Sequence, residues 1–302
     1  MKTADAHCDT LTKFKDEPFY TKNAAWNIKK FKKSAGILQY MAVFIGPPNH
    51  GDSAMCLAVN AIGNFLRRKP KEINLLEKAS DYKENKINII LSLEGASPLI
   101  DEISNLHAFH KLGLRAITLT WNHRNFVADG VGVKGGSGLT DFGEQVVKEM
   151  EKLNMIIDVS HLNEAGFKDL CKIATKPFVA SHSNAFDICP HARNLKKYQA
   201  REIINRKGFI GLNFYAPFIY KSHNKNILTK KFLEHVSYFL NLGAENILGI
   251  GADFDGMDES PFEDVTSYPV LAELLEKELK LKTEIIEKIM YKNLVEFTLK
   301  MI

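Results

Sequence analysis

The pattern of apolar positions divides the chain into short apolar runs and longer amphipathic segments, which alternate from one end to the other. Short apolar runs that are rich in β-branched residues are typical of buried strands. The segments between them are long enough for helices. The apolar runs predict eight strands, at residues 3–6, 37–44, 87–93, 115–119, 155–158, 178–180, 209–213 and 247–251.

The amphipathic segments between the strands predict helices. Apolar residues recur in them at helical spacing, and a glycine or asparagine ends most of them, as Gly113 and Gly243 do. The predicted helices are residues 53–68, 102–112, 142–153, 164–173 and 230–242. The tail from residue 268 to 302 is expected to be helical throughout and to pack against the other elements through Leu271, Leu274, Leu275 and Leu279.

Strands that alternate with helices along the whole chain predict an α/β fold. A (β/α)8 barrel of the TIM type consists of eight parallel strands, each followed by a helix, and this order accounts for the pattern. No Pro-, Gly- or Ser-rich linker divides the sequence. We therefore expect one barrel domain over residues 1–302 with a helical C-terminal tail. A doubly wound open sheet is the competing arrangement.

Composition and charge exclude some classes of partner. The 302 residues are 45% hydrophobic and 25% charged, and 40 Lys and Arg against 36 Asp and Glu leave a net charge of +4. Because the lysines are scattered, a nucleic-acid partner is not expected. The apolar run at residues 35–45 is too short to span a bilayer, and no apolar targeting segment follows Met1. Four dispersed cysteines fit a reducing compartment, so we expect a cytoplasmic protein with no membrane partner.

The candidate chemistry lies where the predicted strands end, which is where a barrel carries its functional side chains. Any one of these residues could be a structural histidine or a turn carboxylate, but their recurrence after five strands favours a metal site. Imidazoles and carboxylates suit zinc, and six groups exceed what one tetrahedral ion uses, so we expect two ions that share a carboxylate. The candidates are His7 and Asp9 after the first strand, Glu94 after the third, His161 after the fifth, His182 after the sixth and Asp253 after the eighth.

Short motifs accompany these residues: HCD at 7–9, LEG at 93–95, DVSH at 158–161, SHSN at 181–184, ARN at 192–194, GADFDG at 251–256 and YKNL at 291–294. In order and spacing they resemble the renal (membrane) dipeptidase family of zinc peptidases, over nearly the whole chain. The resemblance implies a barrel that hydrolyses dipeptides by attack of a metal-bridging hydroxide and often tolerates a D-residue at the C-terminal position. It also implies a homodimer.

The resemblance assigns roles to the matching metal-site residues. His7 and Asp9 would bind one zinc ion. His161 and His182 would bind the other, and Glu94 would bridge the two ions and so take part in catalysis. The expected cofactor is therefore Zn²⁺, two ions per chain, and the expected partner is a small dipeptide substrate.

On the substrate side the resemblance is incomplete. It implies that Asp253 handles the proton of the bridging water or holds the substrate amino group, and that Arg193, assisted by Tyr215, pairs with the substrate C-terminal carboxylate. Well-known mammalian members carry a histidine that polarises the scissile carbonyl, and this chain has Trp121 there. His123 could substitute for it only if the loop bends differently, whereas Trp121 could pack or line the pocket.

Three other functions fit parts of the sequence. A related amidohydrolase acting on a cyclic amide, an acyl-amino acid or a lactone would share the metal site, although such barrels usually open with His-x-His rather than His-x-Asp. A non-catalytic metal-dependent binding protein would keep the ligands while Trp121 marks lost activity. A dinucleotide-dependent oxidoreductase would use GVGVKG at residues 130–135. That segment lies well beyond its strand and opens no helix, so we expect it to be a mobile loop over the site.

Overall fold

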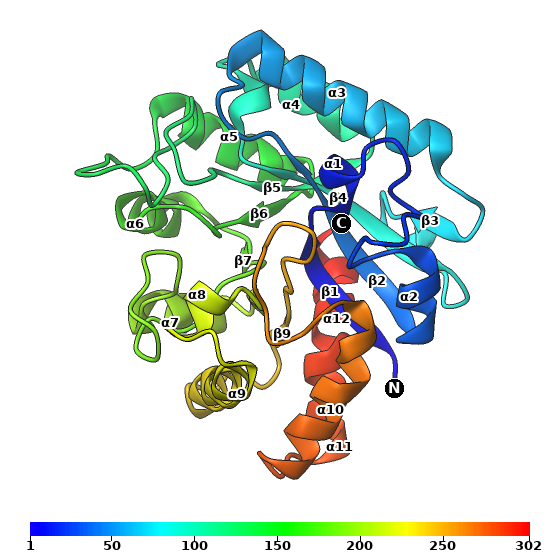
Figure 1. The fold of residues 1–302 in the computed structure, drawn as a ribbon. Helices are drawn as coiled ribbons and strands as arrows, with labels where there is room; N and C mark the ends of the chain where they lie inside the picture. Colours follow the sequence, from blue (N-terminus) through cyan, green and yellow to red (C-terminus); the bar gives the residue numbers. More distant parts are fainter.

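Nine parallel strands form one closed sheet at the centre of the molecule, and helices surround it (Figure 1). The computed structural model describes all of residues 1–302. Neighbouring strands follow the order β2-β1-β9-β8-β7-β6-β5-β4-β3, and pairing of β2 with β4 closes the ring. The strands are β1 (Thr3–Cys8), β2 (Gly36–Phe44), β3 (Ile73–Leu75), β4 (Ile87–Glu94), β5 (Leu114–Thr118), β6 (Ile156–Asp158), β7 (Val179–Ala180), β8 (Phe209–Leu212) and β9 (Leu248–Ile250).

Eight of these strands form the barrel, and they are the eight that the sequence predicts. The additional strand, β3, pairs with the beginning of β4, whereas β5 pairs with its later part. β2 pairs with β4 from Leu38 through Phe44. This pairing closes the barrel and excludes the doubly wound open sheet, which would have two free edges.

The helices cover the outside of the barrel (Figure 1). All five predicted helices between strands are present, although α9 begins at Lys225 rather than at residue 230. None of the helices combines the length and the apolar character that crossing a bilayer requires. The helices are α1 (Thr10–Lys13), α2 (Ile28–Lys33), α3 (Gly51–Arg68), α4 (Ile103–Lys111), α5 (Asp141–Lys152), α6 (Glu164–Ile173), α7 (Lys197–Asn205), α8 (Ala216–Ile219), α9 (Lys225–Asn241), α10 (Tyr268–Lys277), α11 (Thr283–Glu287) and α12 (Asn293–Met301).

The C-terminal tail is helical, as predicted, except for a break between α10 and α11, so it is not helical throughout. α10 ends at Lys277, and Lys280 has a φ of 52°, a left-handed conformation that no helix interior accepts. A π-helix, Lys288–Lys292, then joins α11 to α12. Leu271 and Leu275 of the predicted apolar face are buried, as expected, so the tail packs against the barrel despite the break.

α12 covers the end of the barrel at which the strands begin. The ring of Phe297 lies 6.4 Å from that of Phe209, the first residue of β8. The hydroxyl groups of Tyr40 and Thr298 share a hydrogen bond of 2.7 Å. Since this end is filled by packed side chains, the opposite end, where the strands finish, is the one at which a ligand site can be built.

Candidate metal centre and substrate cavity

The six candidate ligands meet at the C-terminal ends of five barrel strands, as the sequence predicts. They come from segments far apart in the chain, and the exposed fraction of each side chain is 14% or less. Such burial of unpaired ionisable groups is costly unless they pair or bind a metal. His7 lies in β1 and Asp9 follows it, Glu94 ends β4, and His161, His182 and Asp253 lie just beyond β6, β7 and β9.

The carboxylate of Glu94 lies between two groups of ligand atoms. Its Oε1 is 3.0 Å from Nε2 of His161 and 3.7 Å from Nε2 of His182. Its Oε2 is 3.5 Å from Nε2 of His7, which lies 3.4 Å from Oδ2 of Asp9. In each group the ligand atoms lie within 4.8 Å of one another. Each oxygen of Glu94 therefore faces a different potential cation position.

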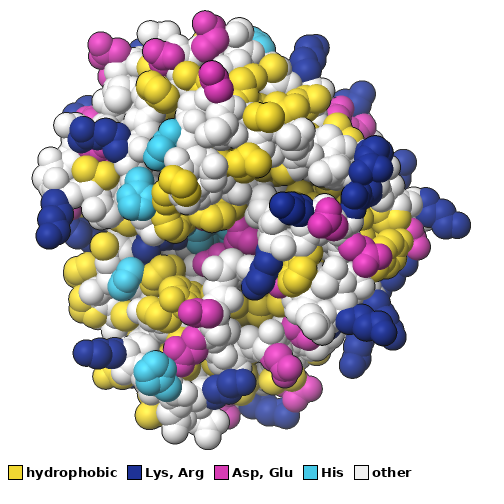
Figure 2. Space-filling view, turned by 45° about the horizontal axis from the view of Figure 1, so that its top comes forward, with side chains coloured by type: hydrophobic (Ala, Val, Ile, Leu, Met, Phe, Trp, Pro, Cys, Tyr) yellow, Lys and Arg dark blue, Asp and Glu magenta, His cyan; other side chains and the backbone are white.

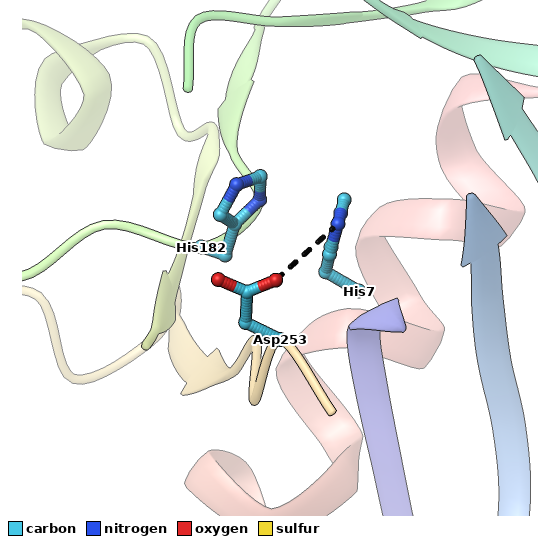
Figure 3. Close-up of side chains that lie close together, drawn as sticks. All are labelled: His7, His182 and Asp253. Carbon is cyan, nitrogen blue, oxygen red and sulfur yellow. Dashed lines mark ion pairs between the residues drawn. The ribbon is translucent and has the colours of Figure 1, made fainter. Parts of the chain in front are cut away.

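Asp253 faces the same centre from the other side. Its Oδ1 is 3.8 Å from Nε2 of His7, and the side chains of His7, His182 and Asp253 converge (Figure 3). The rings of His7 and His182 have centroids 3.8 Å apart. The amide of Asn213, just beyond β8, donates to Oδ2 of Asp253 at 2.9 Å. This bond occupies Oδ2 and leaves Oδ1 facing the centre.

The donor atoms of the centre fit a metal ion. Nε2 of His7 and Oδ1 of Asp9 are buried without a hydrogen-bond partner. Nε2 of His161 lies 3.0 Å from Nε2 of His182. Nδ1 of His161 lies 2.8 Å from Oδ1 of Asn122, which can only accept, so the proton is on Nδ1 and the Nε2 lone pair faces the centre. Convergent lone pairs of this kind are the expected environment of a cation.

A second hydrogen-bond chain fixes His182 in the same way. Nδ1 of His182 lies 2.7 Å from Oγ of Ser181, and the Ser181 hydroxyl donates to Asp158. Ser181 therefore accepts the Nδ1 proton of His182, and the Nε2 lone pair points into the centre. Asp158 also accepts from Thr118 at 2.7 Å, which joins β5, β6 and β7 below the site.

Burial and mutual charge set the protonation of the centre. Burial lowers the pKa of His161 and of His182 well below the usual value, so both are neutral ligands at pH 7. Burial raises the pKa of Asp9 to about 6 and that of Asp253 to about 7. Burial alone would lower the pKa of His7, but the adjacent carboxylates of Glu94 and Asp9 outweigh it and raise that pKa. These shifts arise because three carboxyl groups, Asp9, Glu94 and Asp253, are buried close together.

The backbone around the centre is shaped to aim these side chains. The register of β1 against β2 shifts between Asp5 and Cys8, so β1 carries an extra residue where His7 turns toward the barrel mouth. The buried Asp5 carboxylate accepts from the N–H groups of His7 and Ala252, at 3.1 and 3.0 Å. His161 and Asp253 both have a φ of 68°, which is unfavourable for residues with a Cβ and typical of functional sites.

A cavity of about 510 Å³ opens over the centre, a volume suited to a small ligand. Figure 2 faces this end of the barrel and shows a hollow in which histidine and acidic side chains lie below hydrophobic ones. Asp9, Glu94, His161 and Asp253 form part of its lining. The lining also includes Phe44, Trp121, Asn122, Tyr215 and Phe218.

Tyr215 lines the cavity beside the centre, and Arg193 packs against Phe218, another residue of the lining. The guanidinium of Arg193 is buried, donates through one Nη to the carbonyl of His182 at 3.3 Å and lies 5.4 Å from the ring centroid of Phe218. Its Nε has no hydrogen-bond partner. Burial lowers its pKa to about 10, so it stays cationic at neutral pH. A buried cation with a free donor is suited to an anionic ligand group.

The two residues at the incomplete position have different surroundings. Trp121 lines the cavity, and its ring lies 5.3 Å from that of Phe44 and 6.1 Å from that of His161. His123 is exposed and is absent from the cavity lining. The structure therefore brings Trp121, and not His123, to the substrate side. Asn122, which lies between these two residues in the sequence, lines the cavity and forms a hydrogen bond with His161.

In the glycine-rich segment at residues 130–135, Gly130 to Gly132 pack against neighbouring backbone, and mobility of the rest of the segment stays a prediction. The N–H of Gly132 donates to the carbonyl of Asn122, and the N–H of Val131 donates to the carbonyl of His161, both at 2.9 Å. A Cβ on Gly130 would overlap the carbonyl oxygen of Trp121. These glycines permit close backbone packing beside the metal centre rather than phosphate binding.

Four supporting residues escaped the sequence analysis: Asp5, Asn122, Ser181 and Asn213. Each contacts a candidate ligand or its backbone through a hydrogen bond. Ser181 belongs to the SHSN motif and Asp5 lies two residues before His7, but neither position indicates a supporting role by itself. Asn122 and Asn213 reach residues 39 and 40 positions away, which a linear pattern does not reveal.

Comparison with known families gives a match over almost the full chain. The model of the family described as membrane dipeptidase (peptidase family M19) matches residues 1–300. An uncharacterized protein in the pqqA 5′ region of Klebsiella pneumoniae is 37% identical over 186 residues, covering 58% of this chain and 68% of its own. Dipeptidase tcpJ of Claviceps purpurea is 30% identical over 246 residues, covering 78% of this chain but only 57% of its own.

Solved structures share the fold. A metallo peptidase from Rhodobacter sphaeroides, liganded with a phosphinate mimic of the dipeptide L-Ala-D-Ala, superposes with a TM-score of 0.93 at 23% identity, over 100% of this chain and 99% of the other. Dipeptidase AC, a metallo peptidase of family M19, gives a TM-score of 0.92 at 23% identity over the same shares. At this identity the superpositions establish the barrel alone.

Proposed function

The chain belongs to the membrane dipeptidase family, peptidase family M19, and from this premise we propose that it is a metal-dependent dipeptidase with two zinc ions. The observation that carries the proposal is the position of Glu94, whose two carboxylate oxygens face two separate groups of buried ligand atoms. One carboxylate between two such groups is suited to bridging a pair of ions. The free Nε of Arg193 supplies the second requirement, an anchor for a carboxylate.

The ligand sets follow from the distances around Glu94. His7 and Asp9 would hold one ion together with Glu94, and His161 and His182 would hold the other with the same carboxylate. When bound, such a pair of ions polarises a carbonyl group and lowers the pKa of a water molecule toward neutrality. Neutral imidazoles and carboxylates favour zinc over magnesium or calcium, which prefer all-oxygen sites.

The remaining residues would bind and orient a dipeptide. Arg193 would pair with the terminal carboxylate of the substrate through its unpaired Nε–H, and Tyr215 would border that end of the cavity. Asp253 is not assigned to either ion, and its Oδ1 faces the centre, so it is positioned to accept and return a proton there. Its hydrogen bond from Asn213 keeps one oxygen free for this role.

A related amidohydrolase activity uses the same metal centre but a different anchor. An N-acyl amino acid also carries a terminal carboxylate, whereas a cyclic amide or a lactone offers none to Arg193. A dipeptide further carries a free ammonium group, for which Asp253, the one carboxylate of the centre not assigned to an ion, offers a partner. We therefore place dipeptides ahead of these substrates.

The zinc-loaded protein should be assayed on L-Ala-L-Ala, L-Ala-D-Ala, N-acetyl-L-alanine and dihydrouracil. We expect hydrolysis of at least one dipeptide and negligible turnover of N-acetyl-L-alanine and dihydrouracil. Turnover restricted to the acyl or cyclic substrate would reject the dipeptidase proposal. The variant Trp121→His belongs in the same assay, because an unchanged rate would mean that the family histidine is not limiting here.

Zinc content and assembly are separate proposals. We expect two zinc ions per chain by elemental analysis, and a homodimer by light scattering after size-exclusion chromatography. A cytoplasmic location, proposed from the cysteine usage, is tested by fractionating cells that express the protein.

A further inference from the structure

The cavity over the metal centre has two chemically different sides. On one side the rings of Phe44 and Trp121 lie 5.3 Å apart with a tilt of 56° and form an uncharged aromatic surface, named here the Phe44–Trp121 wall. On the other side lie the rings of Tyr215 and Phe218, and the buried guanidinium of Arg193 packs against Phe218. Figure 2 shows hydrophobic side chains on both borders of the hollow.

These two sides are opposite one another around the barrel. The ring order is β1, β2, β4, β5, β6, β7, β8, β9. Phe44 ends β2 and Trp121 follows β5, so the wall is centred on β4. Tyr215 follows β8, which stands four places from β4 in a ring of eight, and Arg193 lies in the segment between β7 and β8. Among the metal-site residues, Glu94 ends β4 on the side of the wall, and Asp253 follows β9, the neighbour of β8.

The wall is held in place by its backbone. Gly95 has a φ of 88°, and a Cβ there would come within 3.2 Å of the Trp121 amide nitrogen. A Cβ on Gly130 would overlap the Trp121 carbonyl oxygen. Two glycines thus allow the chain to close on both sides of Trp121, and the indole enters the cavity from a fixed backbone. A preorganised apolar surface discriminates better between ligands than a mobile one.

This inference rests on the proposed dipeptidase function and names its substrate class. A dipeptide held by its carboxylate at Arg193, with its peptide carbonyl at the metal centre, directs its N-terminal residue toward the opposite side. We propose that the Phe44–Trp121 wall binds the side chain of the N-terminal residue, and that the preferred substrates carry a large aliphatic or aromatic residue there. Removal of apolar surface from water stabilises such a complex.

The test compares kcat/KM of the zinc-loaded protein for Leu-Ala, Phe-Ala, Gly-Ala and Asp-Ala. We expect Leu-Ala and Phe-Ala to exceed Gly-Ala by about tenfold or more, since each methylene group in an apolar pocket changes specificity by about 10- to 200-fold. Phe44→Ala should reduce the ratio of Leu-Ala to Gly-Ala by about tenfold. Phe44→Leu, which keeps apolar volume, should retain most of the ratio and guards against misfolding of the alanine variant.

Phe126→Ala is the matched control. Phe126 lies in the same connection between β5 and α5 as Trp121, but it is 44% exposed and does not line the cavity. We expect this variant to keep the wild-type ratio. The ratio of kcat/KM for Gly-Leu to that for Gly-Ala, which differ only in the C-terminal residue, should be the same in Phe44→Ala as in the wild type. The reason is that the wall contacts the N-terminal residue.

Fluorescence gives a readout that does not depend on turnover. The chain has two tryptophans, and Trp26 is fully buried. A change of tryptophan emission when a ligand binds at the wall is therefore expected to come from Trp121. L-Leucine should shift the emission at lower concentration than glycine, and Trp121→Phe should abolish the shift.

A Leu-Ala to Gly-Ala ratio near one in the wild-type protein, or an equal loss on both substrates in Phe44→Ala, would overturn the inference while leaving the dipeptidase function intact. If no dipeptide is hydrolysed by the zinc-loaded wild-type protein, the proposed function itself has failed. The two failures are therefore distinguishable in one set of assays.

Discussion

The carboxylate of Asp5 is expected to hold the strand that carries His7, and replacing it should destabilise the protein measurably. Asp5 is fully buried and accepts three hydrogen bonds, from the N–H of His7, the N–H of Ala252 and the hydroxyl of Tyr268, at 3.1, 3.0 and 2.6 Å. The first of these donors lies within the register shift of β1. Asp5 thus joins β1 to the end of β9 just below the metal centre.

The magnitude follows from the number of donors. Asp5→Ala leaves three buried donors without an acceptor, and each costs about 1–3 kcal/mol. Burial also raises the pKa of Asp5, which means that removing the carboxylate relieves part of its own desolvation cost. We therefore expect the free energy of unfolding to fall by about 4 kcal/mol. Asp5→Asn keeps one oxygen for the two N–H groups, and its amide can donate to Tyr268, so its loss should be only about 1 kcal/mol.

Urea unfolding of the metal-free protein measures these losses, and Tyr268→Phe, which removes one donor, should lie between the two variants. The absorption spectrum of the cobalt-substituted protein should change in Asp5→Ala and be largely preserved in Asp5→Asn, because the spectrum reports the coordination by His7. A loss below about 1 kcal/mol in Asp5→Ala, together with an unchanged cobalt spectrum, would refute the reasoning.

Three other side chains give expectations of the same kind. Burial lowers the pKa of His235 to about 4, whereas the unfolded value is about 6.5, so the unfolded chain binds the proton more readily and stability falls as the pH falls through this window. When the pH falls from 7.5 to 4.5, the free energy of unfolding measured in urea should therefore fall by about 2.5 kcal/mol less in His235→Gln than in the wild type. Equal decreases in the two proteins would contradict this. Asn122→Leu removes the acceptor of His161 and should weaken zinc binding about 10- to 100-fold in competition titrations, an effect that a purely structural asparagine would not produce. Arg193→Lys should raise KM for a dipeptide about tenfold with a smaller change in kcat, and an unchanged KM would remove Arg193 from the substrate anchor.

The sequence predicts the eight barrel strands and the meeting of the six candidate ligands, because apolar runs and strand-end residues follow directly from the repeated βα pattern. It does not predict β3, since three residues are too few to show a period. It does not predict the break at Lys280, because lysine is not a residue type that indicates a left-handed backbone conformation. Asn122 escapes for a different reason: its contact with His161 arises only when β5 and β6 lie side by side.

Trp121 shows where a resemblance to a family and a structure complement each other. The resemblance marks it as a departure from a catalytic histidine, and the structure places an indole ring there, 5.3 Å from the ring of Phe44. Apolar contact with the substrate is the chemistry that such a surface provides. The metal centre is therefore expected to determine the reaction, and the Phe44–Trp121 wall the choice of substrate.

The most direct test of the account is the ratio of kcat/KM for the hydrolysis of L-Ala-L-Ala by zinc-loaded wild-type protein and by Glu94→Gln, measured at matched protein concentration with zinc content determined in parallel. Because Glu94 faces both groups of ligand atoms, its loss removes several kcal/mol of stabilisation, and we predict a decrease of about a thousandfold with less than two zinc ions retained per chain. Equal rates and equal zinc content in the two proteins would contradict the central claim.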